Sequence, residues 1–263
     1  MLTFILRTTL ILASYFSFAI YHIRAYAYCQ SILTPVRERK AGSLLSFAVN
    51  LLALSMTLFC DLPALICLIV VYFLVVLQFL YFFYGELAAH IFLSGVFMFH
   101  IMNVKMAVTS TFLLLYDAPS YHVFRENGLS LPCTFVTILL LLISLEVFQK
   151  VIDLSMIQML MKNRSQLRFV TSSMMLINIY LLILSVVYND AVNSGLAGIF
   201  LLSTALLLFG AFYTSFWHGI KMSAMVENEI RSQLLEEQLR TTREDVEELQ
   251  AVAFTDTLTA VHN

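Results

Sequence analysis

Long apolar segments alternate with short polar segments over the first 217 residues of the chain. A hydrocarbon core of about 30 Å requires roughly 20 apolar residues per helix, so this pattern predicts an all-α membrane protein with seven transmembrane helices. The predicted spans are Leu2–Ile23, Gly42–Cys60, Leu62–Tyr84, Leu87–Tyr116, Leu131–Phe148, Phe169–Tyr188 and Ser194–Trp217. The fourth is too long for an untilted span, so its outer third is expected to be interfacial or broken.

Composition excludes a soluble globular protein. Hydrophobic residues make up 60% of the 263 residues and charged residues only 12%, whereas soluble domains carry roughly a quarter charged residues. The expected surroundings are therefore membrane lipids. The formal net charge of −2 provides no basic surface for a phosphate backbone, so no nucleic-acid partner is expected.

The distribution of Lys and Arg predicts the orientation, because basic residues in short loops resist translocation. Basic residues gather after spans one, five and seven, namely Arg24, Arg37, Arg39 and Lys40, then Lys150, Lys162, Arg164 and Arg168, then Lys221. These flanks are expected to be cytoplasmic, with the N-terminus outside and the C-terminus inside. Two features run against the trend: Arg7 near the outer end of span one, and the Gly85-Glu86 turn, which has no basic residue.

A cleaved signal peptide is an alternative interpretation of the N-terminus. Arg7 would be its charged region, Thr8–Ile20 its apolar region and Ala25-Tyr26-Ala27 its cleavage site. Cleavage there would place Arg37, Arg39 and Lys40 outside and invert every later loop. The charge distribution therefore favours the uncleaved, seven-span interpretation.

Polar residues inside a span are candidates for function, because they are costly at membrane depth. The fourth span contains His90, His100, Asn103 and Lys105, which we take as possible intramembrane sensing residues. The alternative is structural: Lys105 reaches the outer interface, and each histidine bonds to a neighbouring helix.

Three further polar residues lie near the inner ends of spans and are expected to be interfacial anchors: His22, Glu146 and His218. Metal sites usually need closely spaced ligands such as H-x-x-x-H, which no span contains, so no metal site is predicted. The last span also contains no lysine for a retinal Schiff base.

After Trp217 the chain turns polar, and Ile220–Asn263 contains neither Gly nor Pro. Its strong helix formers predict that span seven continues as one cytoplasmic helix. An apolar seam with spacings of 4, 3, 4, 3 and 4 runs through Leu235, Leu239, Thr242, Val246, Leu249 and Ala253. This spacing is typical of a coiled coil, whereas Val226 and Ile230 fit a different phase.

The seam is expected to be covered by a second copy of the chain, giving a parallel homodimer. Packing of an amphipathic helix on another domain is the alternative. Acidic residues outnumber basic ones along the helix, so pairing is expected to be weak and to depend on the membrane part or on a domain further along.

The last residues, 253–263, carry the pattern A-x-x-D-x-L-T-x-x-x-N. It resembles the opening of the GGDEF domain of diguanylate cyclases, D-x-L-T-G-L-x-N-R. Asp256, Leu258, Thr259 and Asn263 match, whereas Ala260 stands for the family's Gly and Val261 for its Leu. In that family the motif follows a dimerising helix that leaves a sensor, which is the order found here.

The resemblance implies a bacterial-type plasma (inner) membrane and a signalling role. Diguanylate cyclases condense two GTP molecules with carboxylate-bound Mg²⁺, but this chain has no GGDEF or GGEEF string and no phosphate-binding glycine loop. Neither catalytic residues nor cofactors are therefore assigned to it. We expect a seven-span sensor (1–217), a coiled-coil signalling helix (218–252) and the start of a truncated GGDEF-like domain (253–263).

Two other functions remain open. The sensor region of a histidine kinase would require a phosphoacceptor histidine box, and His262 lies at the extreme end without charged neighbours. A small transporter with an acidic tail would require flux that depends on His90, His100 or Lys105. The sequence does not identify the ligand that is sensed.

Overall fold

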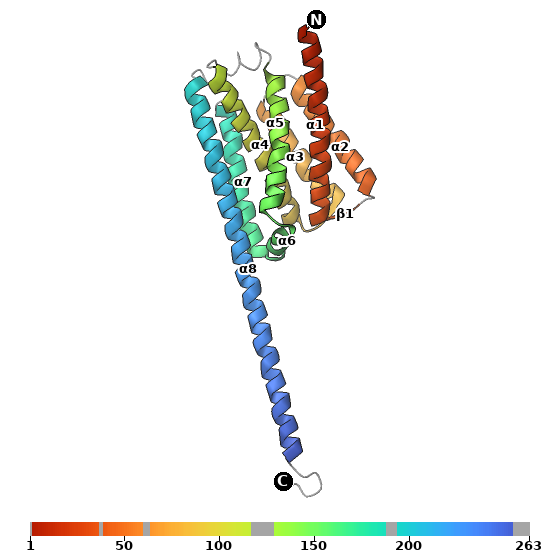
Figure 1. Cartoon of the computed structure of the whole chain (residues 1–263), viewed down its shortest axis with the longest axis vertical. Coiled ribbons are helices and arrows are strands. Elements are labelled where there is room, and N and C mark those ends of the chain that lie inside the picture. The colour runs from red at the N-terminus through yellow and green to blue at the C-terminus, as the bar shows by residue number, and fades with distance from the viewer. Residues whose placement is uncertain (1, 37–38, 60–63, 117–128, 188–193, 255–263) are drawn as a thin grey trace. The chain divides into compact units, whose positions relative to one another are not determined.

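The computed structural model describes residues 2–36, 39–59, 64–116, 129–187 and 194–254, and nearly all of them are helical (Figure 1). The helices are α1 (Leu2–Ile32), α2 (Arg39–Phe59), α3 (Ala64–Phe82), α4 (Leu87–Tyr116), α5 (Ser130–Val151), α6 (Leu154–Lys162), α7 (Arg164–Val187) and α8 (Ser194–Phe254). Two short strands, β1 (Thr34–Pro35) and β2 (Phe83–Tyr84), pair antiparallel. The predicted all-α class is confirmed.

The chain divides into two units, residues 1–220 and residues 221–263. The first unit is a helix bundle. It contains α1 to α7 and the first part of α8, Ser194–Ile220. The rest of α8, which contains the predicted signalling helix, belongs to the second unit.

Among the described residues, four helices are long and apolar enough to cross a membrane. They are α4, α5, α7 over Arg164–Ser185, and α8, whose apolar part lies within Gly195–Ala251. Shorter apolar stretches occupy Ala41–Met56 of α2 and Ile66–Phe82 of α3. Membrane character is thus supported, whereas the number of seven spans stays a prediction.

Helix α4 lies at the centre of the bundle and packs against α3, α5 and α7. Two of its phenylalanines, Phe92 and Phe99, are fully buried and stack on Phe216 and Phe212 of α8. The ring centroids of Phe99 and Phe212 are only 4.2 Å apart. The helix is unbroken over its 30 residues, so its outer third is not broken, and the alternative of an interfacial position stays a prediction.

Two helices extend the sequence-based assignment. Helix α1 continues to Ile32, nine residues past the predicted end of span one at Ile23. The segment between spans five and six forms α6, which ends at an extended Asn163. The backbone N–H of Gln166 donates to Asn163 Oδ1 at 3.3 Å, so Asn163 caps the start of α7.

Polar contacts gather at one end of the bundle, where α1, α3 and α5 end and α4 and α7 begin (Figure 1). The guanidinium of Arg24 lies 3.5 Å from the carboxylate of Glu146, and Arg164 pairs with Glu86. Glu86 belongs to the turn that has no basic residue of its own. Arg164, which lies 78 positions further along the chain, supplies the missing positive charge.

Glycines on α8 provide a test of the packing between α4 and α8. A Cβ at Gly198 would lie 2.8 Å from Leu114 Cγ and 3.1 Å from the carbonyl oxygen of Ser110, both on α4, whereas a Cβ at Gly210 would meet nothing within 4 Å. We expect Gly198→Ala to lower the free energy of unfolding by about 1–3 kcal/mol because the helices must separate.

Gly210→Ala is the matched control, and it is expected to be neutral or slightly stabilising through its higher helix propensity. Unfolding followed by circular dichroism in detergent measures both variants. Equal stability of the two would contradict the close approach of α4 and α8.

Candidate functional site

The four polar residues singled out in the fourth span do not form one site. His100 is buried and surrounded by aromatic rings of α5 and α8, including Phe148, Phe209 and Phe212. Its Nδ1 donates to the carbonyl oxygen of Val96 at 2.8 Å, so this nitrogen carries the proton. His100 therefore packs within the core of the bundle.

Asn103 is fully buried one turn further along α4. Its Nδ2 donates to the carbonyl oxygen of Ala205 on α8 at 3.0 Å. His90 is buried in the first turn of α4, next to Gly85, and Lys105 is exposed. The structure thus brings His100 and Asn103 together against α8 and leaves His90 and Lys105 apart from them.

A different cluster of polar side chains joins α1, α2 and α3. Gln78 and Asn50 form a reciprocal amide pair, with Gln78 Nε2 donating to Asn50 Oδ1 at 2.8 Å and Asn50 Nδ2 donating to Gln78 Oε1 at 3.1 Å. The hydroxyl of Ser46 also donates to Gln78 Oε1, at 2.8 Å. Because the described bundle is apolar around them, these groups satisfy one another.

His22 completes this cluster, which we call the α1–α3 polar cluster: His22, Ser46, Asn50 and Gln78. The Nε2 of His22 lies 3.3 Å from the carbonyl oxygen of Ser43, and its Nδ1 lies 3.3 Å from Asn50 Nδ2. A carbonyl only accepts and this amide nitrogen only donates, so the proton of the imidazole is on Nε2. In this arrangement His22 is neutral, and both of its ring nitrogens form hydrogen bonds.

The expectation that His22 is an interfacial anchor is wrong, because α1 continues to Ile32 and His22 is 5% exposed within it. Asn50 and Gln78 carry no ionisable group, so the cost of burying a charge does not mark them in the sequence. Isolated amides within apolar segments are the signal that could have found them. The other two expected anchors behave differently: Glu146 pairs with Arg24, and His218 is exposed.

The predicted seam lies on α8 in the second unit, and its large apolar side chains are exposed. Leu235, Leu239, Val246 and Leu249 are between 46% and 70% exposed. Thr242 bonds locally through its hydroxyl to the carbonyl oxygen of Gln238, and Ala253 lies within the helix. An exposed row of apolar side chains of this kind is either an interaction surface or a site of aggregation.

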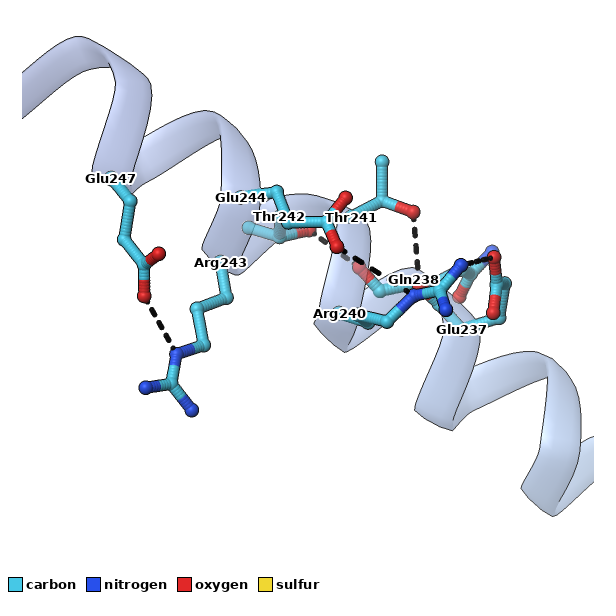
Figure 2. Close-up of polar contacts among 8 residues, drawn as sticks. All are labelled: Glu237, Gln238, Arg240, Thr241, Thr242, Arg243, Glu244 and Glu247. Carbon is cyan, nitrogen blue, oxygen red and sulfur yellow. Dashed lines mark hydrogen bonds and ion pairs between the residues drawn. The ribbon is translucent and has the colours of Figure 1, made fainter.

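Charged side chains of the same segment pair with one another along the helix, as Figure 2 shows. Arg240 contacts Glu237 at 2.7 Å and Glu244 at 3.8 Å, and Arg243 contacts Glu247 at 2.9 Å. These i,i+3 and i,i+4 pairs support a solvated helix. They lie outside the positions of the seam, so the seam is left apolar.

The GGDEF-like motif, Asp256, Leu258, Thr259 and Asn263, lies outside the described residues. Within the described ranges, no three His, Cys, Asp or Glu side chains are arranged to hold a metal ion. Comparison of the chain with families of known proteins, with characterised proteins and with solved structures finds no match. The likeness to diguanylate cyclases therefore stays a prediction from the sequence.

The α1–α3 polar cluster predicts measurable coupling between two side chains. Asn50→Leu and Gln78→Met each remove the amide pair, so the second change should cost less in the presence of the first. We expect a coupling free energy of about 0.5–2 kcal/mol, the range of interhelical hydrogen bonds in membrane proteins. Unfolding of the four proteins of the cycle in mixed micelles measures it, and additive effects would contradict the pairing.

Proposed function

We propose that this chain is the membrane-embedded sensory and signal-transmission region of a signalling protein whose output domain is of the GGDEF type. In this proposal seven helices span a bacterial-type plasma membrane, with the N-terminus outside and the C-terminus in the cytoplasm. Two chains pair in parallel through the signalling helix. The exposed apolar seam of Leu235, Leu239, Val246 and Leu249 is the observation that carries the proposal.

The seam supports pairing because apolar side chains exposed at helical a and d spacing gain free energy by burial against an equivalent helix. Arg240 and Arg243 form ion pairs within their own helix, so they do not offset the acidic residues of a second copy. The excess of acidic residues then opposes close approach of two copies. Weak pairing follows, which suits an assembly that a signal must shift.

The end of the bundle that carries the polar contacts supports the orientation. Arg24, Lys150, Lys162, Arg164 and Arg168 all lie in the helices and turns of that end. Basic residues in short loops mark the cytoplasmic side. The turn at Glu86, which lacked a basic residue, is neutralised there by Arg164.

Transmission is a population shift between packings of the bundle. A ligand or a membrane change that prefers one packing moves α8 relative to α4, along the contacts made by Phe212, Phe216 and Asn103. The continuation of α8 as a helix passes this displacement to the seam. Two output domains that follow the seam then meet differently.

Disulfide crosslinking of the full chain in lipid nanodiscs tests the parallel pairing. In a chain with its four cysteines replaced by serine, Thr242→Cys places a thiol on the seam and Thr241→Cys places one beside it. A parallel coiled coil brings the two Thr242→Cys thiols within bonding range. We expect crosslinking at least ~10-fold faster for Thr242→Cys than for Thr241→Cys, because only seam positions face each other.

Adding Leu239→Lys and Val246→Lys to the Thr242→Cys protein should abolish the crosslink, since four lysines would then face one another. Gln233→Lys with Thr241→Lys adds the same charge away from the seam and should leave crosslinking within ~2-fold, as exposed charges interact weakly. Equal rates for the two thiol positions, or crosslinking that survives the seam lysines, would overturn the dimer.

The output domain is tested separately, by reading the source DNA past codon 263 to the next stop codon in all three frames. An Arg codon after Asn263 and a GG[DE]EF string downstream are expected, as in D-x-L-T-G-L-x-N-R. A stop codon with no such string in any frame would contradict the GGDEF assignment while leaving the dimer untouched.

A further inference from the structure

A partly open cavity of about 200 Å³ lies between α1, α2, α3, α4 and α5. Its walls are mainly apolar, and none of the residues that line it carries a charge. On one side the α1–α3 polar cluster faces it, since His22, Ser46, Asn50 and Gln78 all belong to its lining. A largely apolar pocket with a few convergent polar groups is the usual form of a small-molecule site.

The polar cluster retains hydrogen-bonding capacity after its internal bonds. Asn50 Nδ2 uses both protons, and Gln78 Oε1 accepts twice. By contrast, Gln78 Nε2 donates one of its two protons in these bonds, and the oxygens of Ser46 and Asn50 each have room for a further donor. The cluster therefore suits a ligand with an O–H or N–H group.

The absence of charge among the lining residues selects a neutral ligand. An ion buried there would lose its hydration without gaining a counter-charge, which is costly in an apolar site. His22 is committed as a neutral imidazole through Ser43 and Asn50, so it supplies no positive charge in this arrangement.

The walls and the volume select a small ring. Aromatic side chains face the cavity from α1, α3, β2 and α4, among them Tyr21, Phe79, Phe83 and Phe97. Aromatic rings pack well against one another in offset or edge-on contacts. An apolar cavity of roughly 150 Å³ holds a benzene molecule in another protein, so about 200 Å³ suits a ligand of one or two fused rings.

We propose that this cavity binds a small neutral aromatic molecule with one N–H or O–H group, of the size of indole or phenol. The rings of α1, α3 and α4 enclose the apolar part, and Ser46, Asn50 and Gln78 bond the polar group. Only the further step, that this ligand is the sensed signal, rests on the proposed function.

Equilibrium dialysis with radiolabelled indole tests the site, using the full chain in lipid nanodiscs and empty nanodiscs to correct for partitioning. We expect saturable binding of one indole per chain. Naphthalene has nearly the same shape without the N–H, and is expected to compete about 2- to 10-fold less well, the effect of one hydrogen bond. A charged benzoate should not compete.

Two variants place the binding in the cavity. Ala53→Phe fills the space from α2, where Ala53 lines the cavity, and should abolish binding. Leu52→Phe adds a ring at the adjacent position, which is 62% exposed, and should bind indole as the unaltered chain does. Gln78→Met removes an amide from the polar edge and should reduce the preference for indole over naphthalene.

Binding equal to that of empty nanodiscs would overturn the proposal. Retention of binding in correctly folded Ala53→Phe would overturn it as well. Equal affinity of the unaltered chain for naphthalene and indole would also overturn the proposal. It would show that the cavity is an apolar void that any hydrocarbon or lipid chain fills. Dialysis measures ligand binding, whereas crosslinking measures pairing of two chains. A negative result in one experiment therefore leaves the other proposal standing.

Discussion

Polar side chains enclosed by apolar helices have no water to bond with, so they must bond within the bundle. Among the described residues, three amide contacts join different helices in this way. Asn178 of α7 donates to a carbonyl of α4, Asn103 of α4 donates to a carbonyl of α8, and Asn50 of α2 pairs with Gln78 of α3. Apolar packing alone leaves helices free to slide and rotate, whereas these bonds fix the register of each pair. The arrangement of the bundle depends on them.

Helix α4 connects the two regions that the proposals assign to input and transmission. Phe97 and Ile101 of α4 line the cavity beside the α1–α3 polar cluster. His100 and Asn103, in the same stretch of the helix, contact Tyr213 and Ala205 of α8. A ligand that repositions α4 from the cavity side would thus act on α8 without an intervening element. Phe99 stacking on Phe212 provides a rigid contact for that displacement.

The second unit follows a different physical rule, because its helix is solvated. Its charges pair along the helix, as with Arg243 and Glu247, and contribute little each in water. Its apolar side chains remain exposed and gain free energy only when another surface covers them. The bundle is therefore stabilised by its own core, whereas the function proposed for the tail requires a partner.

The sequence by itself determined the all-α class, the apolar segments and the spacing of the apolar residues in the tail, because hydropathy and residue spacing are properties of a single helix. It also located His90, His100, Asn103 and Lys105, but not their surroundings. Only the tertiary structure decided that His22 joins Asn50 and Gln78, that the segment between α5 and α7 forms the helix α6, and that Arg164 pairs with Glu86. A helix that is apolar on every side carries no periodic signal of which face meets a neighbour, so contacts between helices distant in sequence emerge only when the bundle packs.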